Sequence, residues 1–201
     1  MMIDPTASIN EFLTAAGAKQ ATPGGGAVAA MAGALAASMG EMVLNYSVAK
    51  KDLLAFTEQN TQALKELSDA REMLLKLMVD DQTWYRKYTE AKKLTDEKKT
   101  AEALTNCVHT PLLIGQTAME ILRIANRVAS TSNKWLLSDL AVCGELATAT
   151  VRCAVHNVRV NLSEVSQFMR TKHETDCAHM LKDAVKLVNT LMSSIDTAKA
   201  T

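Results

Sequence analysis

The chain has 201 residues, and its 22 Lys or Arg side chains balance 22 Asp or Glu side chains, so the formal net charge is zero. This balance argues against a protein that recruits nucleic acid or an anionic membrane through its overall field. Hydrophobic residues make up 48% of the chain and aromatic residues only 4%. Because the apolar residues are mostly Ala, Leu, Val and Met, we expect one domain over residues 1–201, an all-α multi-helix bundle with long central helices and no sheet.

The first predicted helix opens at a capping box, Ser8-Ile9-Asn10-Glu11, and stops near Gly17. A turn containing Pro23-Gly24-Gly25-Gly26 follows, and a helix rich in Ala begins at Gly26 or Ala27. This helix lies in the stretch 27–48, which is almost uncharged and about long enough to span a bilayer. Its polar interruptions and its few strongly lipophilic residues favour a buried central helix instead.

Further helices are predicted along the rest of the chain. Residues 53–93 contain no Pro or Gly and form one long helix, with a possible break at Asp80-Asp81. A helix capped by Thr95-Asp96 is expected to end before Pro111, which would open the next helix. Helical spacing resumes at Trp135 and again in the last segment of the chain. A short strand at residues 158–162 is the one alternative, and it lies inside a helical pattern.

The cysteines and the N-terminus indicate a compartment. Four cysteines are far apart and form no CxxC pair, which predicts reduced thiols in a reducing environment. Met1 to Phe12 lacks the basic start and apolar run of a signal peptide. We therefore expect a cytoplasmic protein that is not bound to a membrane. His173 and Cys177 are four residues apart, but no third and fourth ligand is evident, so we expect no metal.

Two polar features lie near the ends of the Ala-rich helix. The glycines of Pro23-Gly24-Gly25-Gly26 let a backbone approach a ligand, and free amides at a helix start attract anions. The same glycines would also serve a tight turn between helices. Lys50 and Lys51 follow the helix, where they either stabilise its carboxyl end or clamp a carboxylate ligand.

Further candidates come later in the chain. Asp81 follows an apolar stretch and precedes Trp84, so it is either a partly desolvated acid with a raised pKa or a solvated residue. Ser138 and Asp139 either cap a helix or face a ligand. Asn157 and Asn161 lie four residues apart on one helix face, where they bind another helix or a heterocyclic ligand.

In this order the motifs resemble one family. The matching segments are Thr22 to Ala30, Asn45-Tyr-Ser-Val-Ala-Lys-Lys51, Asp80 to Tyr85, Leu137-Ser-Asp-Leu-Ala-Val142 and Asn157-Val-Arg-Val-Asn161. The chain is similar over nearly its whole length to the cyclodeaminase/cyclohydrolase family, which contains the cyclodeaminase domain of formiminotransferase-cyclodeaminase and methenyltetrahydrofolate cyclohydrolases.

The resemblance implies a homodimer of helical bundles that binds folate near the subunit interface, with no metal and no cofactor besides the tetrahydrofolate substrate. The matching site positions are Pro23, Gly24, Gly25, Gly26, Lys50, Lys51, Asp81, Ser138, Asp139, Asn157 and Asn161. The chain departs from the family where Lys93-Leu94-Thr95-Asp96 replaces a frequent Leu-Pro-Lys, and where Ala27 replaces a frequent Ser. Either change implies an altered substrate or lost activity.

The activity we expect is hydrolysis of 5,10-methenyltetrahydrofolate to 10-formyltetrahydrofolate. Asp81 or Asp139 would stabilise the cationic bridge and deprotonate the attacking water. Asn157 and Asn161 would orient the pterin, while Lys50, Lys51 and the glycine amides would meet the glutamate tail. The alternatives are a formimidoyltetrahydrofolate cyclodeaminase and a silent protein that binds folate or a partner.

Overall fold

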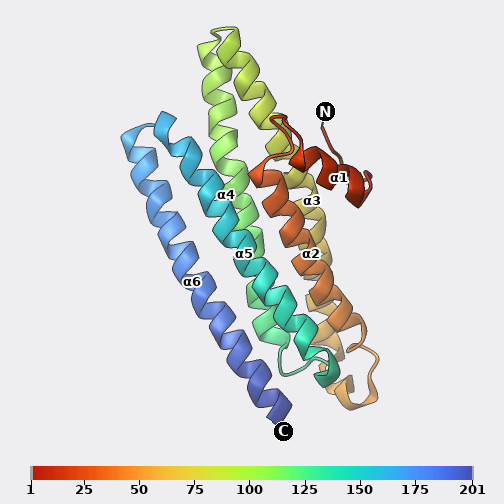
Figure 1. Ribbon diagram of the computed structural model, residues 1–201. Helices are drawn as coiled ribbons and strands as arrows, with labels where there is room; N and C mark the ends of the chain where they lie inside the picture. Colours follow the sequence, from red (N-terminus) through yellow and green to blue (C-terminus); the bar gives the residue numbers. More distant parts are fainter. Residues whose placement is uncertain (1, 201) are drawn as a thin grey trace.

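The structure is a computed structural model that describes residues 2–200, and these residues form a bundle of six α-helices without a strand (Figure 1). Three short 3-10 turns, Lys51–Phe56, Lys134–Leu136 and Leu162–Glu164, connect some of the helices. The helices are α1 (Ile9–Gly17), α2 (Gly25–Asn45), α3 (Thr57–Lys93), α4 (Glu97–Val128), α5 (Leu137–Asn161) and α6 (Gln167–Ala200). The predicted all-α bundle with long central helices is confirmed.

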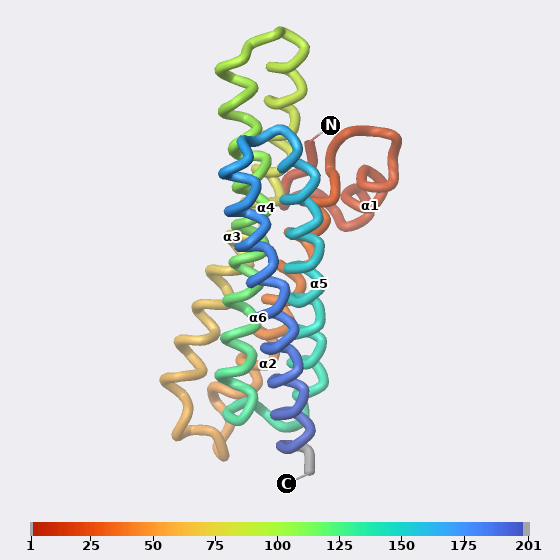
Figure 2. The backbone as a smooth tube through the Cα atoms, turned by 90° about the vertical axis from the view of Figure 1, so that its left-hand side faces the viewer, coloured from red at the N-terminus to blue at the C-terminus, as the bar shows by residue number. Residues whose placement is uncertain are grey.

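Helix α2 lies at the centre of the packing. It contacts both α3 and α5 along its length, and α4 packs against the same two helices. Helix α6 covers α5 and α4 on the outside, while the hairpin of α3 and α4 extends beyond the other helices (Figures 1 and 2). Helix α1 stands beside the amino end of α2 (Figure 1). The long helices thus run side by side, and each end of α2 meets a different set of loops.

Close packing of α2 depends on its small residues. A Cβ atom on Gly33 would lie 3.0 Å from side-chain atoms of both Leu74 and Thr150, and one on Gly40 would lie 2.7 Å from Leu67. Glycine therefore lets α3 and α5 approach the α2 backbone. Among the described residues, α2 is the one helix that is long and apolar enough to cross a membrane, but 56% of that stretch is buried inside the protein. It has the burial of a core helix.

The predicted helix boundary at Pro111 is wrong, because α4 runs without interruption through this residue. Proline lacks an amide hydrogen, so it leaves the carbonyl of the residue four positions earlier without its helical partner. That carbonyl belongs to Cys107, and it accepts a hydrogen bond of 2.9 Å from Asn161 Nδ2 on α5 instead. The neighbouring helix thus satisfies the group that the proline leaves open.

Two other boundary predictions also need correction. Helix α3 begins at Thr57 and continues without a break through Asp80-Asp81. Helix α2 begins at Gly25, with Gly24 as its N-cap, one residue before the earliest predicted start. The capping box is confirmed, since the Glu11 amide donates to Ser8 Oγ and the Ser8 amide donates to the Glu11 carboxylate. Residues 158–161 are helical, so the strand alternative is also excluded.

Candidate active site

The amino end of α2 holds a carboxylate from α3. The Ala27 amide donates a 3.0 Å hydrogen bond to Asp81 Oδ2. A Cβ atom on Gly26 would lie only 2.0 Å from Asp81 Oδ1, so no other residue type fits here without moving the carboxylate. The free amides and the partial positive charge of a helix start favour an anion at this place. The glycine turn therefore receives a carboxylate of the protein itself.

The pKa of Asp81 is raised to about 6, because burial among the helices disfavours the charged carboxylate. The hydrogen bond from the Ala27 amide opposes this effect and lowers the pKa. Burial, and secondarily the charge of Asp81, raises the pKa of the Cys107 thiol on α4 to about 11. At neutral pH Asp81 can accept a proton and return it, as a general base requires.

Two asparagines of α5 complete this cluster. A Cβ atom on Gly25 would lie 2.8 Å from Asn157 Oδ1, so this side chain flanks the glycine next to the one that Asp81 contacts. Asn157 Nδ2 donates to the carbonyl of Cys153, at 2.8 Å. Asn161 Nδ2 donates to the carbonyls of Cys107 and Asn157, at 2.9 and 3.0 Å. Because the amide nitrogens are engaged, both side chains offer oxygen acceptors to a ligand.

A buried glutamine anchors the N-terminal segment next to this cluster. Gln82 is fully buried, its Oε1 accepts from the Ile3 amide at 2.9 Å, and its Nε2 donates to the Ile3 carbonyl at 2.8 Å. The segment before α1 is thereby fixed to α3 at the residue that follows Asp81. Sequence analysis missed Gln82, although a glutamine in an apolar helical run is a signal for a buried hydrogen-bonding role.

The remaining predicted residues lie at the other end of α2. Lys50 pairs with Asp52 at 3.3 Å on the surface, and Lys51 is exposed. Ser138 and Asp139 lie in the first turn of α5, whose N-cap Leu136 makes no side-chain hydrogen bond. Neither side chain therefore caps the helix. The Ser47 hydroxyl accepts from the Asn133 amide at 2.9 Å and ties the end of α2 to the loop before α5.

The predicted site is therefore divided within one chain. A 21-residue helix spans roughly 30 Å, and α2 separates the two groups by about this length. The amino end of α2 brings together Pro23, Gly24, Gly25, Gly26, Asp81, Asn157 and Asn161. The carboxyl end brings together Lys50, Lys51, Ser138 and Asp139. Asp81 and Asp139, the two alternatives for the base, therefore lie at opposite ends of α2 within a single chain.

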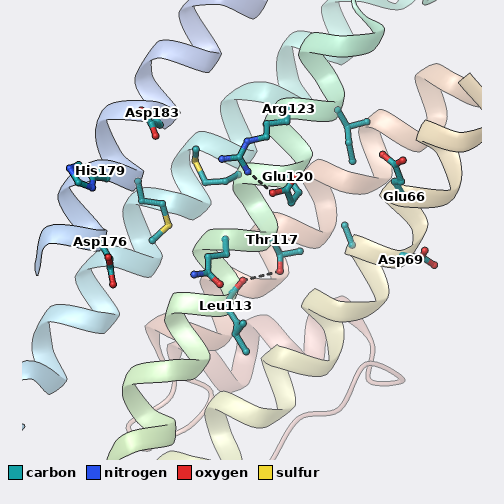
Figure 3. Close-up of a pocket in the computed structure, with 14 residues that line it drawn as sticks. Glu66, Asp69, Leu113, Thr117, Glu120, Arg123, Asp176, His179 and Asp183 are labelled. Carbon is teal, nitrogen blue, oxygen red and sulfur yellow. Dashed lines mark hydrogen bonds and ion pairs between the residues drawn. The ribbon is translucent and has the colours of Figure 1, made fainter. Parts of the chain in front are cut away.

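A groove of about 820 Å³ lies elsewhere, between α3, α4 and α6 (Figure 3). Its acidic side chains are partly paired, since Glu120 binds Arg123 one turn further along α4. His179 faces this groove between Asp176 and Asp183, whereas Cys177 is buried in the core. Burial raises the pKa of the Cys177 thiol to about 11, so the thiolate that a metal requires is disfavoured. The groove contains none of the predicted site residues.

The raised pKa of Asp81 makes a prediction about stability. The folded state holds the proton up to about pH 6, whereas the unfolded carboxyl loses it near pH 3.8. Stability therefore falls as the pH rises through this window and stays lower above it. Asp81→Asn keeps the hydrogen-bond acceptor and removes the charge, so we expect it to raise the free energy of unfolding at pH 7.5 by about 2 kcal/mol. Urea unfolding at pH 4 and pH 7.5 measures this, and an equal effect at both values would contradict it.

Comparison with known proteins identifies the family of this chain. Residues 8–195 match the family described as formiminotransferase-cyclodeaminase. The chain belongs to this family. A methenyltetrahydrofolate cyclohydrolase of Methylorubrum extorquens is 32% identical over 163 residues, which cover 77% of this chain and 78% of that protein. The resemblance predicted from the ordered motifs is thus confirmed.

Two other proteins match most of this chain. The formimidoyltransferase-cyclodeaminase of Gallus gallus is 27% identical over 185 residues, and the match covers 88% of this chain but only 34% of that protein. The crystal structure of formiminotetrahydrofolate cyclodeaminase from Thermotoga maritima superposes with a TM-score of 0.84 at 24% identity, covering 97% of this chain and 96% of that one. This chain and the Thermotoga maritima protein therefore share one fold over nearly the full length of both.

Proposed function

We propose that the protein is a methenyltetrahydrofolate cyclohydrolase of one-carbon metabolism, acting in the cytoplasm. The observation that carries this proposal is the Asp81 carboxylate at the amino end of α2, whose pKa of about 6 suits proton transfer at neutral pH. The cyclohydrolase of Methylorubrum extorquens, which matches over most of both chains, supports the choice of substrate. Folate is the substrate, and the reaction needs no resident cofactor because the substrate itself carries the reactive cation.

Asp81 acts on the water that attacks the 5,10-methenyl bridge. The water oxygen bonds to the bridge carbon while Asp81 takes a proton from the water, and the positive charge of the bridge is neutralised. The bond from the bridge carbon to N5 then breaks, and Asp81 returns the proton to N5. The formyl group remains on N10, and the hydroxyl proton of the intermediate passes to solvent. A carboxylate beside the bridge also stabilises the cation before water attacks.

The two asparagines hold the pterin beside this carboxylate. Their Nδ2 atoms are engaged within the helix bundle, so Asn157 Oδ1 and Asn161 Oδ1 accept hydrogen bonds from ring N–H groups. The backbone of Gly25 lies against Asn157 and lets a flat ring approach. The asparagines thus bind through their oxygens, as expected for the donor-rich edge of a pterin.

A homodimer would reunite the two divided halves of the site. The outward face of α2 is uncharged between its two ends and includes Val28 and Leu35, which are exposed, and Met31, Met39 and Met42, which are partly exposed. Glu41 beside this face is neutralised by Arg71, at 3.1 Å. A twofold axis perpendicular to α2 would pair the amino end of one copy with the carboxyl end of the other. Lys50, Lys51, Ser138 and Asp139 would then face Asp81 across the interface.

Substitution of Leu35 tests the homodimer. This side chain is 52% exposed in the middle of the α2 face. Leu35→Glu would bury an unpaired carboxylate in each subunit, and we expect it to weaken dimerisation at least about 100-fold and to reduce activity. Val185→Glu, at a 40% exposed position of α6, is the matched control and should leave the dimer intact. Light scattering should give twice the 21.8 kDa of one chain for wild type, and a wild-type monomer at micromolar concentration would contradict the homodimer.

The decisive test of the activity follows the loss of methenyltetrahydrofolate absorbance with the purified wild-type chain. A rate no greater than that of buffer would refute the cyclohydrolase.

The second candidate is a formimidoyltetrahydrofolate cyclodeaminase, favoured by the match of 97% of the chain to a protein of that name. In that reaction N10 attacks the formimino carbon on N5 and the N10 proton passes to the formimino nitrogen. Protonated Asp81 donates a second proton to this nitrogen, the carbon–nitrogen bond breaks, and ammonia leaves the methenyl cation. Ammonia release from formimidoyltetrahydrofolate would select this candidate.

A further inference from the structure

A highly exposed tryptophan lies next to the carboxyl end of α2. Trp135 is 85% exposed in the turn Lys134–Leu136, the highest exposure among the large apolar side chains described. Exposure of so large an aromatic surface to water is unfavourable, and tryptophan is enriched where it meets a partner or a ligand. The sequence analysis took this residue only as the start of a helix.

The backbone beneath Trp135 is held by buried polar groups. Asn60 is fully buried, its Nδ2 donates to the Thr131 carbonyl at 2.9 Å, and its Oδ1 accepts from the Thr131 hydroxyl at 2.9 Å. The buried hydroxyl of Ser47 accepts from the Asn133 amide, and Asn133 Oδ1 accepts from the Trp135 amide at 3.3 Å. The indole therefore projects from an anchored turn. An aromatic side chain on a fixed backbone has fewer conformations to lose when it binds a flat ligand.

We propose that Trp135 of one copy stacks on the pterin that the amino end of α2 holds in the other copy, an inference that rests on the proposed function. Within one chain the length of α2 separates Trp135 from Asp81 by roughly 30 Å, so the two cannot touch the same substrate. The twofold pairing of the α2 faces brings the partner's turn to the Asp81 cluster. The ring face of tryptophan attracts both a planar heterocycle and the cationic methenyl bridge.

The stacking makes Trp135 a substrate-binding residue whose loss affects affinity. We expect Trp135→Ala to lower kcat/KM about tenfold through a higher KM, with kcat nearly unchanged, and Trp135→Phe to recover most of the loss. Light scattering on both variants separates loss of stacking from loss of the dimer. If Trp135→Ala dissociates, the comparison uses Trp135→Leu, which keeps an apolar side chain but has no ring, and a KM equal to that of wild type together with an intact dimer contradicts the proposal.

A heterodimer tests whether the two residues act across the interface. Co-expression with two affinity tags yields a dimer of one Asp81→Asn subunit and one Trp135→Ala subunit. Stacking across the interface leaves one complete site, so kcat/KM should be about half that of wild type, whereas stacking within one chain leaves about a twentieth. A value near a twentieth, or an unchanged KM in Trp135→Ala, would overturn the proposal while wild-type activity still supports the proposed function. An inactive wild type refutes the proposed function itself.

Discussion

Asp81→Asn is expected to lower kcat for methenyltetrahydrofolate hydrolysis by about 10²- to 10⁴-fold, the usual contribution of a general base. The amide keeps the acceptor that the Ala27 amide uses, so the local structure is retained, but it cannot take a proton from water. Steady-state kinetics with the absorbance assay measures the effect. The adjacent Asp80→Asn is the matched control, because the two side chains leave the helix in different directions, and it should retain wild-type kcat.

The pH profile of the wild type gives an independent check on the same carboxylate. The base must be ionised, and its pKa is about 6, so kcat/KM should fall tenfold for each pH unit below this value and level off above it. A plateau that extends down to pH 4 would show that another group is the base. Because the same substitution is expected to stabilise the protein at pH 7.5, a variant that is both inactive and more stable would identify Asp81 as a residue kept for function.

Gly26→Ala is expected to have the second largest effect. The new methyl group would meet Asp81 Oδ1 at 2.0 Å, so the carboxylate must rotate away and its bond from the Ala27 amide is lost. We expect kcat to fall at least about tenfold and the free energy of unfolding to fall by about 1–3 kcal/mol. Activity assays and urea denaturation measure both quantities.

Gly17→Ala provides the control for this substitution. A Cβ atom at Gly17 has no neighbour within 4 Å, and the backbone there is compatible with alanine, since no glycine has a positive φ angle among the described residues. It should leave activity unchanged and stabilise α1 by up to about 1 kcal/mol. If Gly26→Ala were as active as Gly17→Ala, the contact between the glycine turn and Asp81 would have no catalytic importance.

Local signals in the sequence predicted much of the fold. The capping box at Ser8 and the cap at Asp96 mark helix starts correctly, because each depends on residues within one helical turn. The helix boundary at Pro111 was predicted wrongly because Asn161, which binds the carbonyl left without its helical partner, lies on another helix and 50 positions later in the chain. Contacts between distant residues leave no periodic trace in a single sequence.

The sequence predicted the candidate site residues as one cluster, whereas the structure places them in two groups. The glycine turn, Asp81 and Asn157 do lie together, since three separate helices bring them to one end of the bundle. Lys50 and Asp139 lie at the opposite end, because α2 runs the length of the bundle between the two groups. Within one chain only Asp81 lies beside the glycine turn, and this is why we propose Asp81 as the base.

The bond between Asn161 and the carbonyl of Cys107 has a consequence for how this sequence can vary. A proline in the middle of a helix usually weakens the helix. Here the absent amide hydrogen leaves the Cys107 carbonyl available to Asn161, and this bond sets the register of α5 against α4. Positions 111 and 161 are therefore coupled through one hydrogen bond, and a change at either of them affects the other. A residue other than proline at position 111 would supply an amide that shares the Cys107 carbonyl, which weakens the bond from Asn161 that holds α5 in register.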